Sequence, residues 1–175
     1  MTTNTIRLEQ QLIIGEINQV FKTNNKCSVK MQCGAGKTNV ILNILTDYPG
    51  DLFVIVYPIN MLVTQLGNYL SGAEWFDKFG HMLVNNGCVE DGETIRRFIS
   101  GSGKKIISCT YQSFDTLMSV LSGMDAKIGL VVCDGAHDII GSKAYGIILN
   151  DNMTDIRTIF LSNASPYEVK AIDGL

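Results

Sequence analysis

A short glycine-rich stretch constrains the fold of this chain more than any other feature. The sequence MQCGAGKTNV, residues 31–40, follows a strand-like apolar segment and precedes a run of residues with helical spacing. Small residues let consecutive backbone N–H groups point inward, and the dipole of the following helix favours an anion there. The stretch predicts a phosphate-binding loop, and the residues expected to bind a nucleotide are Cys33, Gly34, Ala35, Gly36, Lys37 and Thr38.

The last two residues of this loop carry its specific chemistry. Lys37 is expected to place its ammonium group on the terminal phosphates, and the Thr38 hydroxyl to coordinate the Mg²⁺ that accompanies a nucleotide. The full pattern GxxxxGK[ST] requires glycine where Met31 stands, so the strict motif is not met. The position between a strand and a helix favours phosphate binding over the alternative, an ordinary strand-to-helix turn.

Apolar periodicity divides the chain into alternating helices and strands. Helical spacing begins at Ile6 and ends near Phe21, and the run LFVIVY is typical of a strand buried on both faces. Such alternation predicts one α/β domain, with a mainly parallel sheet, helices on both faces and ligands at the carboxyl ends of the strands. Strands are expected at 27–32, 52–57, 81–84, 105–110, 129–133 and 158–162, and further helices at 39–45, 60–70, 92–100 and 112–121.

The final segment is expected to open another helix. VKAIDGL, residues 169–175, comes soon after the point where that helix would begin, and it contains no stop signal. We therefore expect residues 1–175 to be a single domain, either part of a longer protein or a short remnant of one.

Composition narrows the possible classes of protein. With 175 residues, 46% of them hydrophobic, the chain can bury the core of one domain. A formal net charge of −3 provides no basic field that would capture nucleic acid by itself. The five cysteines form no CxxC pair, which favours a reducing intracellular compartment over a disulfide framework or a zinc site, and no apolar run is long enough to span a membrane.

Five segments in order resemble motifs in the first RecA-like domain of superfamily 2 helicases and translocases, a group that includes DEAD/DEAH-like and Res-type proteins. The segment IRLEQ resembles the adenine-reading element upstream of the phosphate loop, with Gln10 at the glutamine position and Arg7 near its start. Glu9 stands where an aromatic residue is often found. The resemblance implies that Arg7 and Gln10 contact the nucleotide.

Two further segments resemble motifs that border the nucleic-acid track in this family. PINMLVTQ matches the P-x-x-x-L-x-x-Q pattern of motif Ia, and CTYQS resembles the TYQS element of duplex DNA translocases. The resemblance implies a nucleic-acid partner, with DNA favoured over RNA. The residues implied to contact it are Pro58, Gln65, Thr110, Tyr111 and Gln112.

The last two segments resemble the DEAH box and motif III. In VVCDGAH, Asp134, Ala136 and His137 match the box, which implies that Asp134 holds Mg²⁺ and acts in catalysis with Lys37 and His137. SNASP resembles the T-A-T-P of motif III, with Asn163 departing from the usual threonine. Motif III implies a role in coupling for Asn163, Ala164 and Ser165.

The resemblance to the DEAH box fails at one position. The family's glutamate orients or deprotonates the attacking water, and Gly135 occupies its place. A general base commonly contributes about a hundredfold to ten-thousandfold in rate. We therefore expect impaired hydrolysis with phosphate and metal binding retained. Asp138 is a weak candidate for a substitute base, because three residues further on it is expected to point elsewhere.

The resemblance runs from residue 6 to residue 166 and implies the ATP-binding domain of an ATP-dependent helicase or translocase, with ATP and Mg²⁺ as cofactors. In that family the site lies against a second RecA-like domain, which supplies an arginine and is absent from this chain. Arg96, Arg97 and Arg157 are expected to be surface or ion-paired residues instead. The alternative functions are a non-catalytic nucleotide-binding or scaffolding module derived from a helicase and, less favoured, a small P-loop kinase.

Each motif taken alone also has a structural explanation. Gln10 would lie on a polar helix face, Pro58 would end a strand, and Thr110 would cap a helix. His137 would be a structural histidine, and residues 163–166 would form a plain turn. The order and spacing of all five segments favour the functional interpretation.

Overall fold

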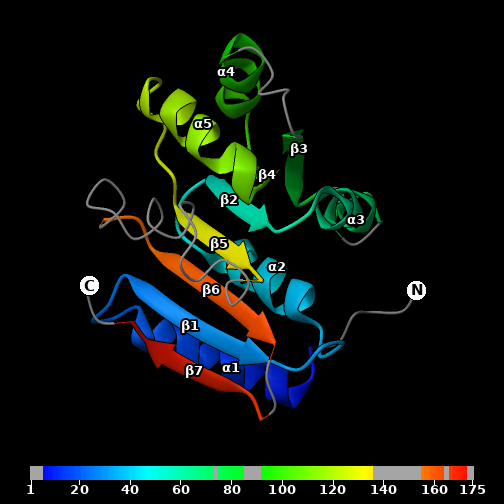
Figure 1. The fold of residues 1–175 in the computed structure, drawn as a ribbon, viewed down its shortest axis with the longest axis vertical. Helices are drawn as coiled ribbons and strands as arrows, with labels where there is room; N and C mark the ends of the chain where they lie inside the picture. Colours follow the sequence, from blue (N-terminus) through cyan, green and yellow to red (C-terminus); the bar gives the residue numbers. More distant parts are fainter. Residues whose placement is uncertain (1–5, 73–74, 85–91, 136–154, 164–165, 173–175) are drawn as a thin grey trace.

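The structure is a computed structural model, and it describes residues 6–72, 75–84, 92–135, 155–163 and 166–172. These residues form a seven-stranded sheet and five helices (Figure 1). The strands are β1 (Lys26–Met31), β2 (Leu52–Tyr57), β3 (Phe79–Val84), β4 (Lys104–Thr110), β5 (Leu130–Asp134), β6 (Thr158–Asn163) and β7 (Glu168–Ala171). The helices are α1 (Leu8–Val20), α2 (Lys37–Asp47), α3 (Asn60–Leu70), α4 (Gly92–Ser100) and α5 (Tyr111–Ser122).

The sheet has the strand order β3-β4-β2-β5-β6-β1-β7. Strands β1 to β6 pair in parallel, and β7 is antiparallel to β1. The carboxyl ends of the six parallel strands therefore share one edge of the sheet, which is where α/β proteins place their ligands. This architecture confirms the predicted α/β class, a P-loop NTPase fold of RecA-like type with a mainly parallel sheet.

Alternate residues of the central strands face two different helical layers. On β2, Phe53, Ile55 and Tyr57 belong to the core beneath α1, α2 and α3. Val54 and Val56 belong to the core beneath α4 and α5. Because helices cover both faces, every residue of β2 is buried, which explains its unbroken apolar run.

The expectation of a helix after residue 166 is wrong for the described residues, because Glu168–Ala171 forms the edge strand β7. Glu168 lies directly opposite Lys30 of β1, and Lys30 Nζ lies 2.9 Å from a Glu168 carboxylate oxygen. Val169 packs against the core beneath α1. Pairing with the free edge of β1 has overridden the local preference of this short segment, as is common for strands.

A lysine at the amino end of the sheet holds the end of α2. Lys104 begins β4, and its Nζ donates hydrogen bonds to the carbonyl oxygens of Leu45 (3.0 Å), Tyr48 (2.5 Å) and Gly50 (3.4 Å). The last carbonyls of a helix lack partners within the helix, and a cation there also opposes the negative end of the helix dipole. Lys104 therefore fixes the carboxyl end of α2 to the sheet.

The boundaries of the elements differ from the predicted ones by a few residues. Helix α2 begins two residues earlier than expected, at Lys37, and β3 begins at Phe79 instead of at residue 81. Among the helices of the described ranges, none combines the length and the apolar character that a membrane crossing requires.

Candidate nucleotide-binding site

The loop between β1 and α2 has a backbone that requires glycine. Gly34 and Gly36 have φ angles of 77° and 86°, in the left-handed region that side chains disfavour. A Cβ atom on Gly36 would also lie 2.5 Å from Nε2 of Gln10. Gly36 immediately precedes α2, so the N-terminal N–H groups of that helix follow the loop directly.

Gln10 ties the first helix to this loop. Its side chain is only 4% exposed, and its Nε2 donates a hydrogen bond of 2.9 Å to the Ala35 carbonyl oxygen. Its Oε1 accepts hydrogen bonds from the Arg7 backbone N–H at 3.1 Å and from Asn39 Nδ2 at 3.4 Å. Gln10 is thus not on a solvated helix face, and its side chain contacts the phosphate loop. Arg7 precedes the helix and is exposed.

Three strands bring polar side chains to one place at the carboxyl edge of the sheet. Tyr57, Asp134 and Asn163 are the last residues of β2, β5 and β6. The register pairs Val56 with Cys133 and Asp134 with Leu161, so Tyr57 and Asp134 come side by side one position further on. The tertiary structure therefore gathers residues that are far apart in the chain.

Lys37 contacts the end of β6 directly. Its Nζ donates a hydrogen bond of 2.5 Å to Oδ1 of Asn163, which lies opposite Met31 of β1. The residue that departs from the usual motif III threonine is thus the one that holds the lysine of the phosphate loop. A neutral amide oxygen is a weaker partner for an ammonium group than a phosphate oxygen, because the phosphate carries charge.

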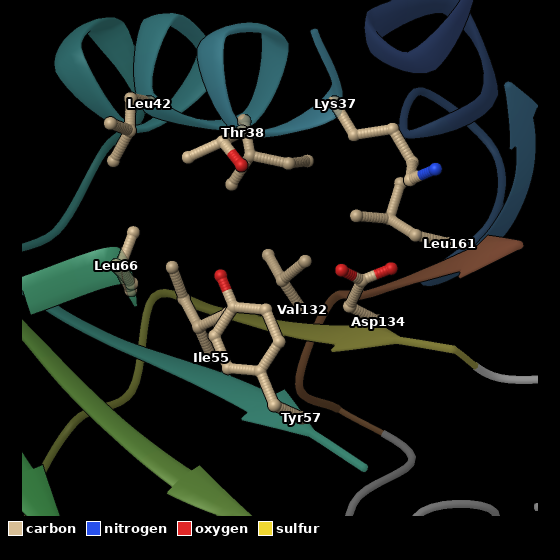
Figure 2. A pocket seen from close by; sticks show the side chains of 10 residues that line it. Lys37, Thr38, Leu42, Ile55, Tyr57, Leu66, Val132, Asp134 and Leu161 are labelled. Atoms are coloured by element: carbon tan, nitrogen blue, oxygen red, sulfur yellow. The ribbon is translucent and has the colours of Figure 1, made fainter. Parts of the chain in front are cut away.

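Lys37, Tyr57 and Asp134 line one hollow beneath the first turn of α2, whereas Asn163 does not line it (Figure 2). Its polar side chains are those of Lys37, Thr38, Tyr57 and Asp134. Figure 2 shows the Asp134 carboxylate and the Tyr57 hydroxyl pointing toward that turn of the helix. The remaining lining is aliphatic and consists of Ile41, Leu42, Ile55, Leu66, Val132 and Leu161.

Sequence reasoning did not identify Tyr57 as part of the site. Burial raises the pKa of its phenol, and the nearby negative charge of Asp134 raises this pKa further. The hydroxyl is therefore protonated at neutral pH, and it can both donate and accept a hydrogen bond. A signal was present in the sequence, since Tyr57 is the one polar-ended residue in the run LFVIVY and immediately precedes Pro58.

The donor set fits a magnesium ion bound with a nucleotide. A threonine hydroxyl and a carboxylate line the same hollow, and Mg²⁺ prefers oxygen ligands. The described residues contain no cluster of three His, Cys, Asp or Glu side chains that would form an all-protein metal cage. Mg²⁺ suits this arrangement because it commonly keeps several waters and takes its other ligands from phosphates.

The position after Asp134 has no side chain and a constrained backbone. Gly135 is buried and has a φ angle of 69°. Its N–H donates a hydrogen bond of 2.9 Å to Oδ1 of Asp134, which orients that carboxylate. Three predicted site residues, His137, Ala164 and Ser165, lie outside the described residues, as do Ala136 and Asp138.

The residues predicted to contact nucleic acid divide into exposed and buried ones. Gln65 and Gln112 are exposed and Pro58 is half-buried. Thr110 is 2% exposed and Tyr111 is 8% exposed. The Tyr111 hydroxyl donates a hydrogen bond of 2.8 Å to the backbone carbonyl oxygen of Asp134. In this structure Thr110 and Tyr111 support the site from within the fold, which leaves the other three residues accessible to a ligand.

The arginines lie away from the hollow. Arg97 and Glu93 form an exposed pair on α4 with a nitrogen to oxygen distance of 3.6 Å. Arg157 donates one hydrogen bond of 2.9 Å to the Phe21 carbonyl oxygen and another of 3.2 Å to the Tyr48 hydroxyl. Arg157 is therefore a structural residue that joins the ends of α1 and α2, and no arginine is among the described residues that line the hollow.

Comparison with models of known protein families shows which family this chain belongs to. The model of the family described as type III restriction enzyme, res subunit, matches residues 3–162. The chain belongs to this res-subunit family. The match extends from α1 to β6 and includes every described residue of the hollow.

Solved structures with the same fold include two DNA-bound enzymes and one helicase domain. A nuclease-deletion mutant of the Type ISP restriction-modification enzyme LlaGI, in complex with a DNA substrate mimic, is 17% identical, with a TM-score of 0.72 over 91% of this chain and 17% of that chain. The ATP-dependent Type ISP enzyme LlaBIII bound to DNA is 18% identical, with a TM-score of 0.72 over 91% of this chain and 12% of that one. The Hef helicase domain of Pyrococcus furiosus is 21% identical, with a TM-score of 0.62 over 91% and 34%.

These res-subunit and helicase similarities confirm the resemblance to the first RecA-like ATP-binding domain of superfamily 2 helicases. The chain spans at most 34% of the length of these three structures. A search of the curated proteins found no match.

Proposed function

We propose that this chain is the ATP-binding domain of an ATP-dependent nucleic-acid helicase or translocase, and that it binds Mg²⁺ with ATP at the hollow beneath α2. The observation that carries the proposal is the convergence of Lys37, Thr38 and Asp134 on that hollow, at the start of a helix and the carboxyl edge of a parallel sheet. Lys37 would contact the terminal phosphates, and Thr38 and Asp134 would hold the metal.

The residues of this chain account for binding better than for turnover. Nucleotide binding would draw Lys37 from Asn163 to a phosphate, and the Gly135 N–H would continue to orient Asp134. The bound Mg²⁺ would neutralise charge on the phosphates. Position 135 offers no carboxylate to orient water, so we propose that hydrolysis is impaired.

We further propose that the complete protein acts on DNA and contains a second RecA-like domain. The LlaGI structure is a complex with a DNA substrate mimic, the LlaBIII enzyme is bound to DNA, and the description of the matching family names a restriction enzyme. The positions that we propose for communication between ATP and DNA are the accessible residues Pro58, Gln65 and Gln112, together with Asn163, Ala164 and Ser165 as coupling residues. His137 is proposed as a catalytic residue on the resemblance alone.

A second candidate is a non-catalytic nucleotide-binding or scaffolding module derived from a helicase. Gly135 favours it, because the fold and the phosphate loop remain while the usual glutamate is absent. Phosphate release, measured with duplex DNA and a second RecA-like domain present, distinguishes the two functions. Release that DNA stimulates supports the enzyme, whereas tight nucleotide binding with no release above background supports the module.

Calorimetry of the 175-residue chain with ATP and Mg²⁺ tests the nucleotide site. Lys37→Ala removes a charge-assisted hydrogen bond, which corresponds to roughly 10- to 150-fold in affinity. Lys127→Ala is the matched control, since Lys127 is exposed and precedes the amino end of β5, away from the hollow. Equal affinity in both variants would remove the phosphate-loop assignment.

A further inference from the structure

Tyr57 is a buried residue whose hydroxyl faces the candidate nucleotide site. Its side chain is 7% exposed, and within the described residues its hydroxyl makes no hydrogen bond. The hydroxyl oxygen is not one of the fully enclosed polar atoms that lack a partner, which are Asn60 Oδ1 and Trp75 Nε1. It is therefore open to the hollow into which Figure 2 shows it pointing.

Tyr57 also lines a second hollow, which adjoins the first. Thr38, Tyr57, Leu66 and Asp134 line both hollows, so Tyr57 lies where they meet. The second hollow extends to Gln65 and other residues of α3. A ligand held by Thr38 and Asp134 would consequently have the Tyr57 hydroxyl on the side that leads to α3.

The chemistry of the three oxygens decides what Tyr57 contacts. The Asp134 carboxylate accepts hydrogen bonds and binds cations, and Thr38 would coordinate the metal directly. The Tyr57 phenol is protonated at neutral pH, since the ordinary pKa of a tyrosine is about 10. Its hydroxyl oxygen can accept a hydrogen bond from a metal-bound water. A protonated phenol cannot take up the proton of that water, which excludes Tyr57 as a replacement for the missing general base.

We propose that Tyr57 is a positioning residue whose hydroxyl oxygen accepts a hydrogen bond from a water of the nucleotide-bound Mg²⁺, beside Asp134. This inference rests on the proposed function, since it assumes that Thr38 and Asp134 hold the metal. Mg²⁺ keeps several of its waters in protein sites, and each of these waters has hydrogen-bond partners in its surroundings. Tyr57 is a partner supplied by β2, whereas Thr38 comes from α2 and Asp134 from β5.

The tyrosine also gives this site a direct connection to motif Ia. Tyr57 ends β2, Pro58 follows it, and α3 begins at Asn60. A change in the waters around the metal would thus reach the segment that joins β2 to α3. Helix α3 contains Gln65, which lines the second hollow. The connection deepens the proposed coupling of ATP to DNA by naming a residue that touches the metal's surroundings from the motif Ia side.

The test measures how much Mg²⁺ strengthens nucleotide binding in Tyr57→Phe. Phenylalanine keeps the ring and its packing and removes only the hydroxyl. We expect affinity for ATP in EDTA to equal that of the unsubstituted chain, and the gain on adding Mg²⁺ to be smaller by roughly two- to tenfold, the effect of one neutral hydrogen bond. Tyr69→Phe is the matched control, because Tyr69 lines the second hollow only.

The outcomes separate this inference from the proposed function. An equal gain from Mg²⁺ in Tyr57→Phe and in the unsubstituted chain would overturn the role of Tyr57 while leaving nucleotide binding intact. No gain from Mg²⁺ in the unsubstituted chain would also overturn it. Absence of any ATP binding that Lys37→Ala weakens would overturn the proposed function, and the inference with it. A reduced gain confined to Tyr57→Phe supports the inference.

Discussion

Lysines at the amino end of the sheet donate more hydrogen bonds within the fold than the lysine at its carboxyl end. At the amino end, Lys104 donates to three backbone carbonyls, and Lys105 donates to the carbonyl oxygens of Gly101 and Gly103 at 2.5 and 2.8 Å. At the carboxyl end, Lys37 donates to one neutral oxygen, on Asn163. An ammonium group has three donors, so the first arrangement satisfies the lysine within the fold and the second leaves capacity for a ligand.

The two tyrosines that flank Asp134 repeat this contrast across the sheet. Tyr111 belongs to the core beneath α5, and its hydroxyl is bonded to the Asp134 backbone. Tyr57 belongs to the core beneath α2, and its hydroxyl faces the hollow. A polar group that the fold satisfies serves the fold, whereas one that the fold positions but leaves without a partner is available for function.

The largest expected effect comes from exchanging the two lysines for methionine one at a time. Lys104→Met keeps the apolar stem but leaves three carbonyls without the charged donor, so the free energy of unfolding should fall by about 2 to 3 kcal/mol. The melting temperature should fall by roughly 4 to 12 °C. Lys37→Met should leave stability nearly unchanged, as its single partner Asn163 is exposed.

Thermal melting and nucleotide titration of both variants measure this contrast. We expect Lys104→Met to bind ATP like the unsubstituted chain at temperatures where it is folded. If the two variants lost stability equally, the distinction between a structural and a functional lysine would be wrong.

A smaller loss of stability is expected when the pH is lowered, from His81 on β3, the strand that pairs with β4. Burial lowers the pKa of His81 to about 4, and its Nε2 lies 2.7 Å from the Ser108 hydroxyl oxygen. In the unfolded chain this pKa is near 6.5, so the stability that neutral His81 contributes is fully present above about pH 6.5. It is lost as the pH falls from about 6.5 to 4, by on the order of 2 kcal/mol after discounting for partial exposure.

Urea unfolding at several pH values tests this loss. His81→Gln retains a polar side chain that does not titrate, and it should flatten the dependence between about pH 6.5 and 4. An equally steep dependence in His81→Gln would assign the acid sensitivity to other groups.

The smallest of these losses of stability is expected from Gly135→Ala, at the carboxyl end of the sheet. Its φ angle of 69° costs an L-residue about 1 to 2 kcal/mol, so Gly135→Ala should lower stability by about that amount. Gly135→Glu should lower stability at least as much, because position 135 is buried. Only the glutamate adds a carboxylate. Phosphate release should therefore rise in Gly135→Glu and not in Gly135→Ala, with nucleotide affinity within a few-fold of the unsubstituted chain.

This measurement requires duplex DNA and a chain long enough to include the second RecA-like domain that we propose, because in the resembled family that domain supplies an arginine to the site. If the unsubstituted protein already released phosphate as fast as Gly135→Glu, another residue would be the base. The site would then be catalytic without a carboxylate at position 135.

Local sequence determined the elements and the loop of this protein. The run LFVIVY is typical of a strand covered on both sides, and GAGKT between a strand and a helix predicts a phosphate loop, because periodicity and small residues act over a few positions. The glycine-rich loop predicted Lys37 and Thr38 as site residues, and the resemblance of VVCDGAH to the DEAH box predicted Asp134.

The tertiary structure decided which side chains share a space and which are satisfied. It placed Tyr57 beside Asp134, paired Lys37 with Asn163, buried Thr110 and Tyr111, and turned residues 168–171 into a strand. None of these outcomes follows from neighbouring residues, because strand order and register bring together positions far apart in the chain. The sequence also identifies a tyrosine or a lysine without showing whether the fold gives its hydroxyl or ammonium group a hydrogen-bond partner.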